Sequence, residues 1–224
     1  MIQFLLAAPN SGSGKTTLAC ALLAALKNRG YAPCAFKCGP DYIDPMFHRA
    51  VLGVESHNLD LFFSSPETAR GLYASGAAGH GAAVCEGAMG FYDGLSGTST
   101  TASAWQVADT LNLPVLLVVR PKGASLTLAA QIKGLQSFRT PSHLAGILLN
   151  DCKPGLYKML APMLEAETGL PVAGFLPPVP EAAIGSRHLG LYTAGEVADL
   201  QQKIALLAQA AEENIHWGKT AFPL

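Results

Sequence analysis

A short run rich in glycine, serine and threonine near the amino terminus has the composition of a loop that binds phosphate. Residues 9–17 read PNSGSGKTT and lie between an apolar run and a segment rich in alanine and leucine. Glycines let backbone N–H groups converge on a polyphosphate, a lysine reaches its outer phosphates, and a neighbouring hydroxyl group can bind Mg²⁺. The residues expected to contact a nucleotide here are Asn10, Ser11, Gly12, Ser13, Gly14, Lys15, Thr16 and Thr17.

The first position of this loop departs from the usual pattern, G-x-x-x-x-G-K-[ST], because Pro9 stands where glycine is expected. The alternative is a chance turn of glycine and serine that precedes a helix. An apolar strand before the loop and a helix after it favour a nucleotide site, since the amino terminus of the helix adds a favourable dipole. We therefore expect ATP and Mg²⁺, with Lys15 balancing phosphoryl charge and Thr16 binding the metal.

Three acidic residues follow apolar strands and are candidates for a magnesium site. Glu86 ends the apolar run 81–85, where the acidic residue of a Walker-B strand lies beside a phosphate loop. Asp41 and Asp44 belong to the loop KCGPDYIDP, which follows another strand. Mg²⁺ prefers oxygen ligands and is usually held by one or two protein carboxylates. The alternatives are a solvated strand end for Glu86, and turn or helix-cap chemistry for the two aspartates.

Apolar runs of strand length alternate with helical segments along the chain. Residues 87–103 are too polar for a core and too long for an ordinary connection, so we expect a functional loop there. The alternation predicts an α/β fold of three layers, a P-loop NTPase fold with a mostly parallel central sheet flanked by helices. The six predicted strands span residues 2–8, 33–37, 81–85, 114–119, 143–149 and 171–175. The predicted helices span residues 16–29, 44–52, 65–75, 105–111, 125–138, 154–168 and 195–214.

Length, charge and cysteine content narrow the class of protein. The 224 residues are 50% hydrophobic and contain no linker-like stretch, so we expect one domain over residues 1–224. The formal net charge of -1, from 15 basic and 16 acidic residues, gives no basic footprint for nucleic acid. The five cysteines lack disulfide or zinc spacing, and no apolar run is long enough for a signal peptide or a membrane span. We expect a cytoplasmic protein without nucleic-acid or membrane partners.

Three motifs together resemble a known family. The runs APNSGSGKTT at residues 8–17, FKCGPDYIDP at 36–45 and EGAMGFYDG at 86–94 resemble the synthetase domain of cobyrinic acid a,c-diamide synthase, and SRHLGL at 186–191 is a fourth match. Dethiobiotin synthetase is a more distant relative. The resemblance implies that ATP phosphorylates carboxylates of cobyrinic acid or a related tetrapyrrole, and that ammonia then displaces phosphate to give amides at the a and c side chains. Such activation is needed because a carboxylate is a poor acyl donor.

The resemblance also implies roles for individual polar residues. Asn150 resembles the residue that reads adenine in these folds, with a plain turn before Asp151 as the alternative. A structural role is the alternative for His188. The implied magnesium ligands are Thr16, Asp41, Asp44 and Glu86. The implied catalytic residues are Lys15, Lys37 and Asp93. The implied residues for substrate binding or loop ordering are Tyr42, His48, Ser186, Arg187 and His188.

The resemblance also implies partners. Full-length members of the family continue into a glutamine amidotransferase domain, which is absent from these 224 residues. None of the five cysteines has the setting of a nucleophile elbow followed by a distal histidine. Ammonia is therefore expected from glutamine through a separate or truncated glutaminase domain, or as free ammonia. Related folds often dimerise, so a homodimer is also considered.

Two other functions compete with this interpretation. A partitioning-type ATPase carries a second lysine five residues before the invariant one, where Asn10 stands, and it favours aspartate in place of Glu86. Its membrane-targeting helix would be basic, unlike residues 195–214. A dethiobiotin synthetase-like ligase would phosphorylate the adduct of a small diamine with carbon dioxide, and the run GPDYIDP argues against it.

Overall fold

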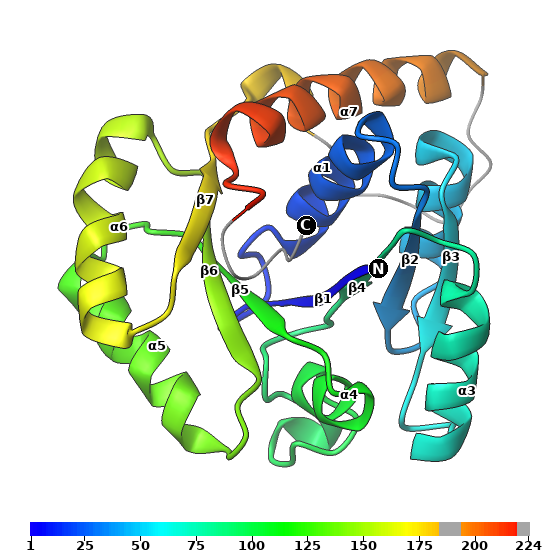
Figure 1. Ribbon diagram of the computed structural model, residues 1–224, viewed down its shortest axis with the longest axis horizontal. Coiled ribbons are helices and arrows are strands. Elements are labelled where there is room, and N and C mark those ends of the chain that lie inside the picture. The colour runs from blue at the N-terminus through cyan, green and yellow to red at the C-terminus, as the bar shows by residue number, and fades with distance from the viewer. Residues whose placement is uncertain (184–193, 219–224) are drawn as a thin grey trace.

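A seven-stranded sheet lies at the centre of the molecule, and all of its strands run parallel. The computed structural model describes residues 1–183 and 194–218. The strands are β1 (Ile2–Ala7), β2 (Pro33–Cys38), β3 (Glu55–Leu59), β4 (Ala82–Glu86), β5 (Val115–Val119), β6 (Leu144–Asn150) and β7 (Val172–Leu176). They lie side by side in the order β3-β2-β4-β1-β5-β6-β7 (Figure 1).

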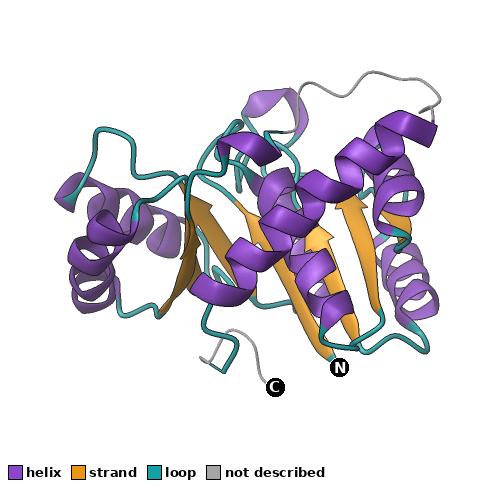
Figure 2. Ribbon diagram, turned by 90° about the horizontal axis from the view of Figure 1, so that it is seen from above, coloured by secondary structure: helices purple, strands orange, loops and turns teal. Residues whose placement is uncertain are grey.

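Helices cover both faces of the sheet, which gives three layers (Figure 2). The α-helices are α1 (Lys15–Asn28), α2 (Ile43–Phe47), α3 (Pro66–Ala77), α4 (Ala104–Leu111), α5 (Leu126–Phe138), α6 (Pro154–Thr168) and α7 (Ala194–Asn214). Helices α1 and α7 pack together on one face, and α3, α4, α5 and α6 cover the other. A π-helical turn (His48–Leu52) continues α2, and short 3-10 turns lie at Leu95–Gly97 and Pro180–Ala182. The predicted three-layer fold is thereby confirmed.

The central strands are apolar because both of their faces are covered. β5 reads VLLVV and all five of its residues are buried, and β1 contributes Phe4, Leu5 and Leu6 with no exposed surface. Alternate residues of β1 therefore enter different cores, Phe4 and Leu6 beneath α1 and Leu5 beneath α4. Such continuous apolar runs are typical of parallel sheets. All six predicted strands are present, with ends within two residues of the prediction.

The predicted count of six strands was wrong, because the sheet has a seventh, β3. This strand reads ESHNL and pairs only with β2 at the edge of the sheet. Only Ser56 and Leu59 of its five residues are buried, so no apolar run marks it in the sequence. Edge strands face solvent on one side and tolerate polar residues. The apolar run 81–85, predicted as the third strand, is therefore the fourth.

The loops with the predicted motifs meet at one edge of the sheet. β1 lies beside β4, and β4 lies beside β2. Residues 8–14, 39–42 and 87–94 leave the carboxyl ends of these three strands. Ligands of open α/β sheets bind in the crevice beyond the carboxyl ends of the strands. The sheet order therefore brings together three motifs that are far apart in the sequence.

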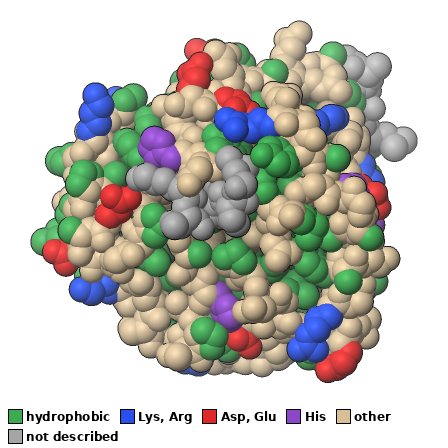
Figure 3. Space-filling model, viewed as in Figure 1, with side chains coloured by type: hydrophobic (Ala, Val, Ile, Leu, Met, Phe, Trp, Pro, Cys, Tyr) green, Lys and Arg blue, Asp and Glu red, His purple; other side chains and the backbone are tan. Residues whose placement is uncertain are grey.

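The surface view shows charged side chains of both signs spread among apolar and polar ones. On the face in Figure 3, Lys and Arg lie scattered and in places beside Asp and Glu, without a continuous basic area. Among the described residues, no helix combines the length and the hydropathy that crossing a membrane requires.

Candidate nucleotide-binding site

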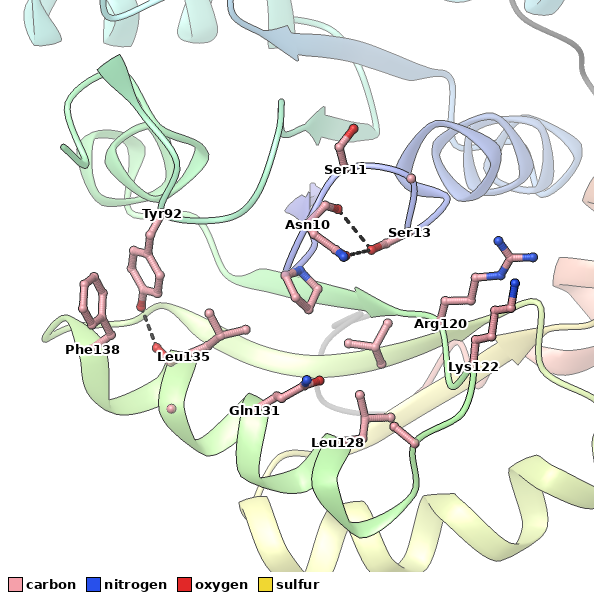
Figure 4. Close-up of a pocket in the computed structure, with 15 residues that line it drawn as sticks. Asn10, Ser11, Ser13, Tyr92, Arg120, Lys122, Leu128, Gln131, Leu135 and Phe138 are labelled. Atoms are coloured by element: carbon pink, nitrogen blue, oxygen red, sulfur yellow. Dashed lines mark hydrogen bonds between the residues drawn. The ribbon is translucent and has the colours of Figure 1, made fainter. Parts of the chain in front are cut away.

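The loop between β1 and α1, here called the P-loop (residues 9–17), is held in a tight turn by its own side chains. Ser13 Oγ donates to Asn10 Oδ1 at 2.6 Å and lies 3.1 Å from the carbonyl oxygen of Asn10 (Figure 4). Gly12 and Gly14 have positive φ angles of 78° and 93°, a region that favours glycine. The loop opens directly into α1, whose amino terminus favours an anion.

Asn150, at the end of β6, holds the P-loop in place through its side chain. Its Nδ2 donates to the carbonyl oxygen of Ser13 at 3.0 Å. A Cβ atom on Gly14 would lie 1.9 Å from this nitrogen, so glycine is needed there for close approach as well as for its φ angle. Asn150 therefore positions the P-loop in this structure. Its contact with adenine stays a prediction.

Lys15 connects the P-loop to the loop after β4. Its Nζ donates to the carbonyl oxygen of Met89 at 2.5 Å and lies 3.5 Å from that of Asn10. Burial is the largest influence on the pKa of Lys15 and holds it below its ordinary value; the carboxylate of Glu86 opposes this shift, and the charge of Lys37 adds to it. A bound phosphate would supply the anionic partner that this buried ammonium group needs.

A buried chain of contacts joins Thr16, Glu86, Lys37 and Asp44. Thr16 Oγ1 donates to Glu86 Oε1 at 2.5 Å, and Lys37 Nζ donates to the same oxygen at 2.8 Å. Lys37 Nζ also lies 2.8 Å from Asp44 Oδ2. Glu86 is 1% exposed, Lys37 6% and Asp44 5%. Four of the predicted site residues are thus brought together at the start of α1.

Strand register explains why Lys37 and Glu86 meet. The two residues are partners across β2 and β4. Two residues earlier in each strand, Ala35 and Val84 belong to the core cluster beneath α1. Side chains alternate along a strand, so Lys37 and Glu86 lie on the same face. That face is the one covered by α1, which begins beside Thr16.

The charge on Lys37 is stabilised by two carboxylates. Burial acts most strongly and would lower the pKa of Lys37, but Glu86 and Asp44 together outweigh it and raise the pKa well above its ordinary value. Lys37 is therefore an ammonium ion throughout the pH range in which proteins are usually studied. It offsets the charge of two carboxylates that would otherwise repel each other in a buried site.

The donor set fits a hard cation beside the P-loop. Glu86 Oε2 is buried and makes no hydrogen bond within the described residues. A buried carboxylate oxygen without a partner is costly, and a cation would satisfy it. The described residues contain no group of three or more His, Cys, Asp or Glu that could hold a metal alone. Mg²⁺ is usually bound by one or two carboxylates together with phosphate and water, so Thr16 and Glu86 fit this ion.

Asp41 has the helix-cap geometry that the sequence left open as an alternative. Its Oδ1 accepts hydrogen bonds from the backbone N–H groups of Ile43 at 2.8 Å and of Asp44 at 3.3 Å, at the start of α2. Asp41 thereby places Asp44 against Lys37. The direct metal contact predicted for Asp41 stays a prediction.

Asn58 is a residue of this site that sequence reasoning missed. Its Nδ2 donates to the carbonyl oxygens of Gly39 at 2.9 Å and of Asp41 at 2.7 Å, and so holds the turn between β2 and α2. Asn58 belongs to β3, the strand that was not predicted. An asparagine among polar residues carries no sequence signal, so only the position of the edge strand reveals its role.

The remaining predicted residues lie in different settings. Tyr42 is 70% exposed and borders the cavity beside the P-loop, so it is available to a ligand. His48 is 1% exposed and its Nδ1 lies 3.0 Å from Ser56 Oγ, which is a loop-ordering position rather than a substrate contact. Asp93 Oδ2 accepts from the N–H of Gly90 at 3.1 Å, within the loop after β4. Ser186, Arg187 and His188 lie outside the described residues.

Three cavities formed by the described residues border the P-loop. The largest, about 810 Å³, lies between the P-loop and α5. The second, about 690 Å³, is lined by Lys37, Glu86 and residues 39–43. The third, about 410 Å³, lies between Asn150 and the proline-rich residues 177–180. The P-loop is thus accessible to ligands on three sides.

Comparison with known proteins identifies the family of this fold. Residues 4–190 match the family model described as the CobQ/CobB/MinD/ParA nucleotide binding domain. The chain belongs to this family. The family description names nucleotide binding, and the buried contacts of Thr16, Glu86 and Lys37 lie at the end of the P-loop where α1 begins.

Within the family, the chain is similar to curated proteins that are named as a,c-diamide synthases. The chain is 39% identical to a cobyrinate a,c-diamide synthase of Clostridium tetani, over 96% of this chain and 48% of that protein. It is 40% identical to one of Gloeobacter violaceus, over 97% and 48%. A hydrogenobyrinate a,c-diamide synthase of Streptomyces coelicolor is 41% identical over 87% and 40%. The chain thus spans about half the length, or less, of these relatives.

Among solved structures, chloroplast FtsY of Physcomitrella patens shares the fold. The TM-score is 0.55 at 13% sequence identity, over 90% of this chain and 64% of that one. At this identity the likeness concerns the fold alone.

Replacing Asn150 with alanine is expected to weaken ATP binding by about tenfold, because the carbonyl group of Ser13 loses a buried donor and such a loss costs about 1–3 kcal/mol. Calorimetry with ATP and with inorganic triphosphate would measure it. Equal losses for both ligands would assign Asn150 to loop positioning, and a loss confined to ATP would assign it to adenine. Unchanged affinity for both ligands would contradict both roles. Asn28→Ala, at the exposed end of α1, is the control.

Proposed function

We propose that the chain is a P-loop synthetase domain over residues 1–224, which uses ATP to amidate the a and c side-chain carboxylates of cobyrinic acid or a related tetrapyrrole. The observation that carries the proposal is the buried group of Thr16, Glu86, Lys37 and Asp44 at the end of the P-loop. It brings together the P-loop, the Walker-B position and the KCGPDYIDP loop, which are the motifs of the resemblance. The names of the curated relatives support the same reaction.

The proposed reaction requires the site to activate a carboxylate, which is a poor acyl donor. The acceptor carboxylate attacks the terminal phosphorus of ATP, and the bond from that phosphorus to the bridging oxygen of ADP breaks. Ammonia then adds to the acyl carbon, phosphate leaves with the C–O bonding pair, and one N–H proton passes to the leaving phosphate. The protein contributes positioning and charge balance. Lys15 neutralises the outer phosphates, Lys37 lies near the transferred group, and Asp93 acts beside the acceptor or its intermediate.

Mg²⁺ is proposed as the cation of the site, with Thr16 and Glu86 as ligands and Asp44 and Asp41 beside them. When bound, it would neutralise charge on the phosphates. Lys37 now balances the charges of Glu86 and Asp44. It also keeps the two carboxylates together while the metal is absent.

The proposed partners are the macrocyclic acceptor and ammonia, which a glutaminase releases from glutamine. We place the reaction in the cytoplasm. All five cysteines are buried and no disulfide joins them, which fits a reducing compartment. Burial raises the pKa of Cys38, next to Lys37, to about 12, so this thiol is not a nucleophile at neutral pH.

The partitioning ATPases of the same family are disfavoured by Asn10. A second lysine, expected at this position in such proteins, would project from the P-loop. Here the side chain of Asn10 accepts from Ser13 within the loop. The curated relatives are also named as synthases rather than partitioning proteins.

Turnover with ammonia tests the proposal directly. The chain is incubated with ATP, Mg²⁺, ammonium chloride and cobyrinic acid, and the products are analysed by mass spectrometry. We expect ADP, phosphate and products about one mass unit lighter for each OH replaced by NH₂. Diaminopelargonate with bicarbonate is the comparison substrate. Turnover of that substrate alone, or of neither under conditions in which ATP binds, would contradict the proposal.

A further inference from the structure

The largest cavity beside the P-loop has no role in the site described above. It lies between the P-loop and α5, with a volume of about 810 Å³. Figure 4 shows Asn10, Ser11 and Ser13 along one side and Leu128, Gln131 and Leu135 of α5 along the other. Cavities that bind small ligands measure about 300–1,000 Å³ and are mostly apolar. We name this cavity the α5 pocket.

One end of the α5 pocket is an aromatic wall. The rings of Tyr92 and Phe138 lie 5.0 Å apart, and Tyr92 OH donates to the carbonyl oxygen of Leu135 at 2.6 Å. The bond fixes the ring of Tyr92 against α5, where the ring also packs against Phe91 and lines the cavity. Phe138 is 55% exposed, and the guanidinium group of Arg139 lies over its ring, 4.2 Å from the ring centroid. This end suits a flat, apolar ligand surface.

The other end of the pocket is cationic. Arg120 and Lys122, from the segment between β5 and α5, both line it (Figure 4). Arg120 forms an ion pair with Asp151. This pair holds the guanidinium group in place and neutralises part of its charge. Lys122 is exposed. Basic groups at one end and aromatic rings at the other match a ligand that is apolar in one part and carboxylated at its edge.

The position of the pocket suits the acceptor of a phosphoryl group. Ser11 and Gly12 line both the α5 pocket and the cavity that contains Lys37 and Glu86. A ligand in the α5 pocket therefore lies on one side of Ser11 and Gly12, and the proposed cation site lies on the other side. The third cavity, beside Asn150, is where the base of the nucleotide is expected. A reacting acceptor must come within about 3–3.5 Å of the group it attacks, which requires a site bordering the same loop.

We propose that the α5 pocket binds the body of the carboxylated macrocycle, with its apolar face on Tyr92 and Phe138 and its peripheral carboxylates at Arg120 and Lys122. This inference rests on the proposed function and adds to it the location of the acceptor. The reactive carboxylate reaches over Ser11 and Gly12 towards Lys15.

A glycine in the wall of the pocket gives a selective test. Gly134 of α5 lines the cavity, and a Cβ atom added there meets nothing within 4 Å. Gly134→Phe is therefore expected to occupy part of the pocket and to leave the helix intact. We expect the Kd for cobyrinic acid to rise at least about tenfold and the Kd for ATP to stay within about twofold. The first is measured by calorimetry and the second with a fluorescent ATP analogue.

Gly71→Phe is the matched control. Gly71 lies in α3, is exposed, and also has open space at its Cβ position. The control is expected to bind both ligands as the unchanged chain does. A loss of cobyrinic acid binding in Gly134→Phe but not in Gly71→Phe supports the inference.

Four outcomes would overturn it. Unchanged binding of cobyrinic acid by Gly134→Phe would reject the α5 pocket and leave the proposed function intact. Equal loss of ATP and cobyrinic acid would assign the cavity to the nucleotide. A change in sedimentation mass with unchanged acceptor binding would make the pocket an interface between copies. If the unchanged chain binds ATP but not cobyrinic acid, the proposed acceptor fails first, and the inference fails with it.

Discussion

Glu86→Gln is expected to reduce ATP turnover by about two to three orders of magnitude, comparable to the loss of one essential electrostatic contact in other enzymes. The carboxylate accepts from Thr16 and Lys37 through Oε1, and its Oε2 has no hydrogen-bond partner among the described residues. Glutamine keeps the shape and an acceptor but removes the charge. The variant is therefore expected to bind ATP without Mg²⁺ nearly as well as the unchanged chain, while needing far more Mg²⁺ for turnover.

The measurement is ATP hydrolysis or amide formation as a function of Mg²⁺ concentration, with circular dichroism to verify folding. Glu167→Gln, at an exposed position of α6, is the matched control and is expected to have no effect. A folded Glu86→Gln protein that retains turnover within about threefold of the unchanged chain would remove Glu86 from the site of phosphoryl transfer.

Much of the fold was predictable because its strands are covered on both faces. β5 is a short, unbroken apolar run and β1 is interrupted only by Gln3, and such runs between helical segments are typical of buried parallel strands. β3 was not predictable for the opposite reason, since its residues at the sheet edge have no need to be apolar. β3 forms because it pairs with β2, and this pairing cannot be recognised from the sequence of β3 alone.

The site was predictable where one loop makes it and less so where several elements meet. The P-loop is a local arrangement of Gly12, Gly14 and Lys15, so its residue types identify it. The pair Lys37 and Glu86 depends on the register between β2 and β4. The position of both at strand ends suggested proximity, but the hydrogen bond of Asn58 to the turn after β2 depends on tertiary structure alone.

The structure also distinguishes between two roles that the sequence had left open for the two aspartates. Asp41 and Asp44 are three residues apart, which suits both a helix cap and a metal site. The structure uses Asp41 as the cap and directs Asp44 to Lys37. Cap and charge cluster are therefore parts of one arrangement, since the cap determines where Asp44 lies.

Lys37→Met is expected to destabilise the metal-free chain by about 3–5 kcal/mol, because removing one partner of a buried ion pair leaves uncompensated charge. Glu86 and Asp44 would then face each other in a site where both are nearly inaccessible to water. Urea unfolding in the presence of a chelator measures the change.

Mg²⁺ should reverse part of this loss. A cation that binds the folded state stabilises it, and in Lys37→Met it would occupy a site from which the competing ammonium group has been removed. The rise in stability on adding Mg²⁺ is therefore expected to be larger in the variant than in the unchanged chain. Lys133→Met, at an exposed position of α5, should show neither the deficit nor the larger response. A metal-free Lys37→Met protein as stable as the unchanged chain would show that Lys37 does not balance the two carboxylates, and a response to Mg²⁺ that is no larger would show that its ammonium group does not compete with the cation.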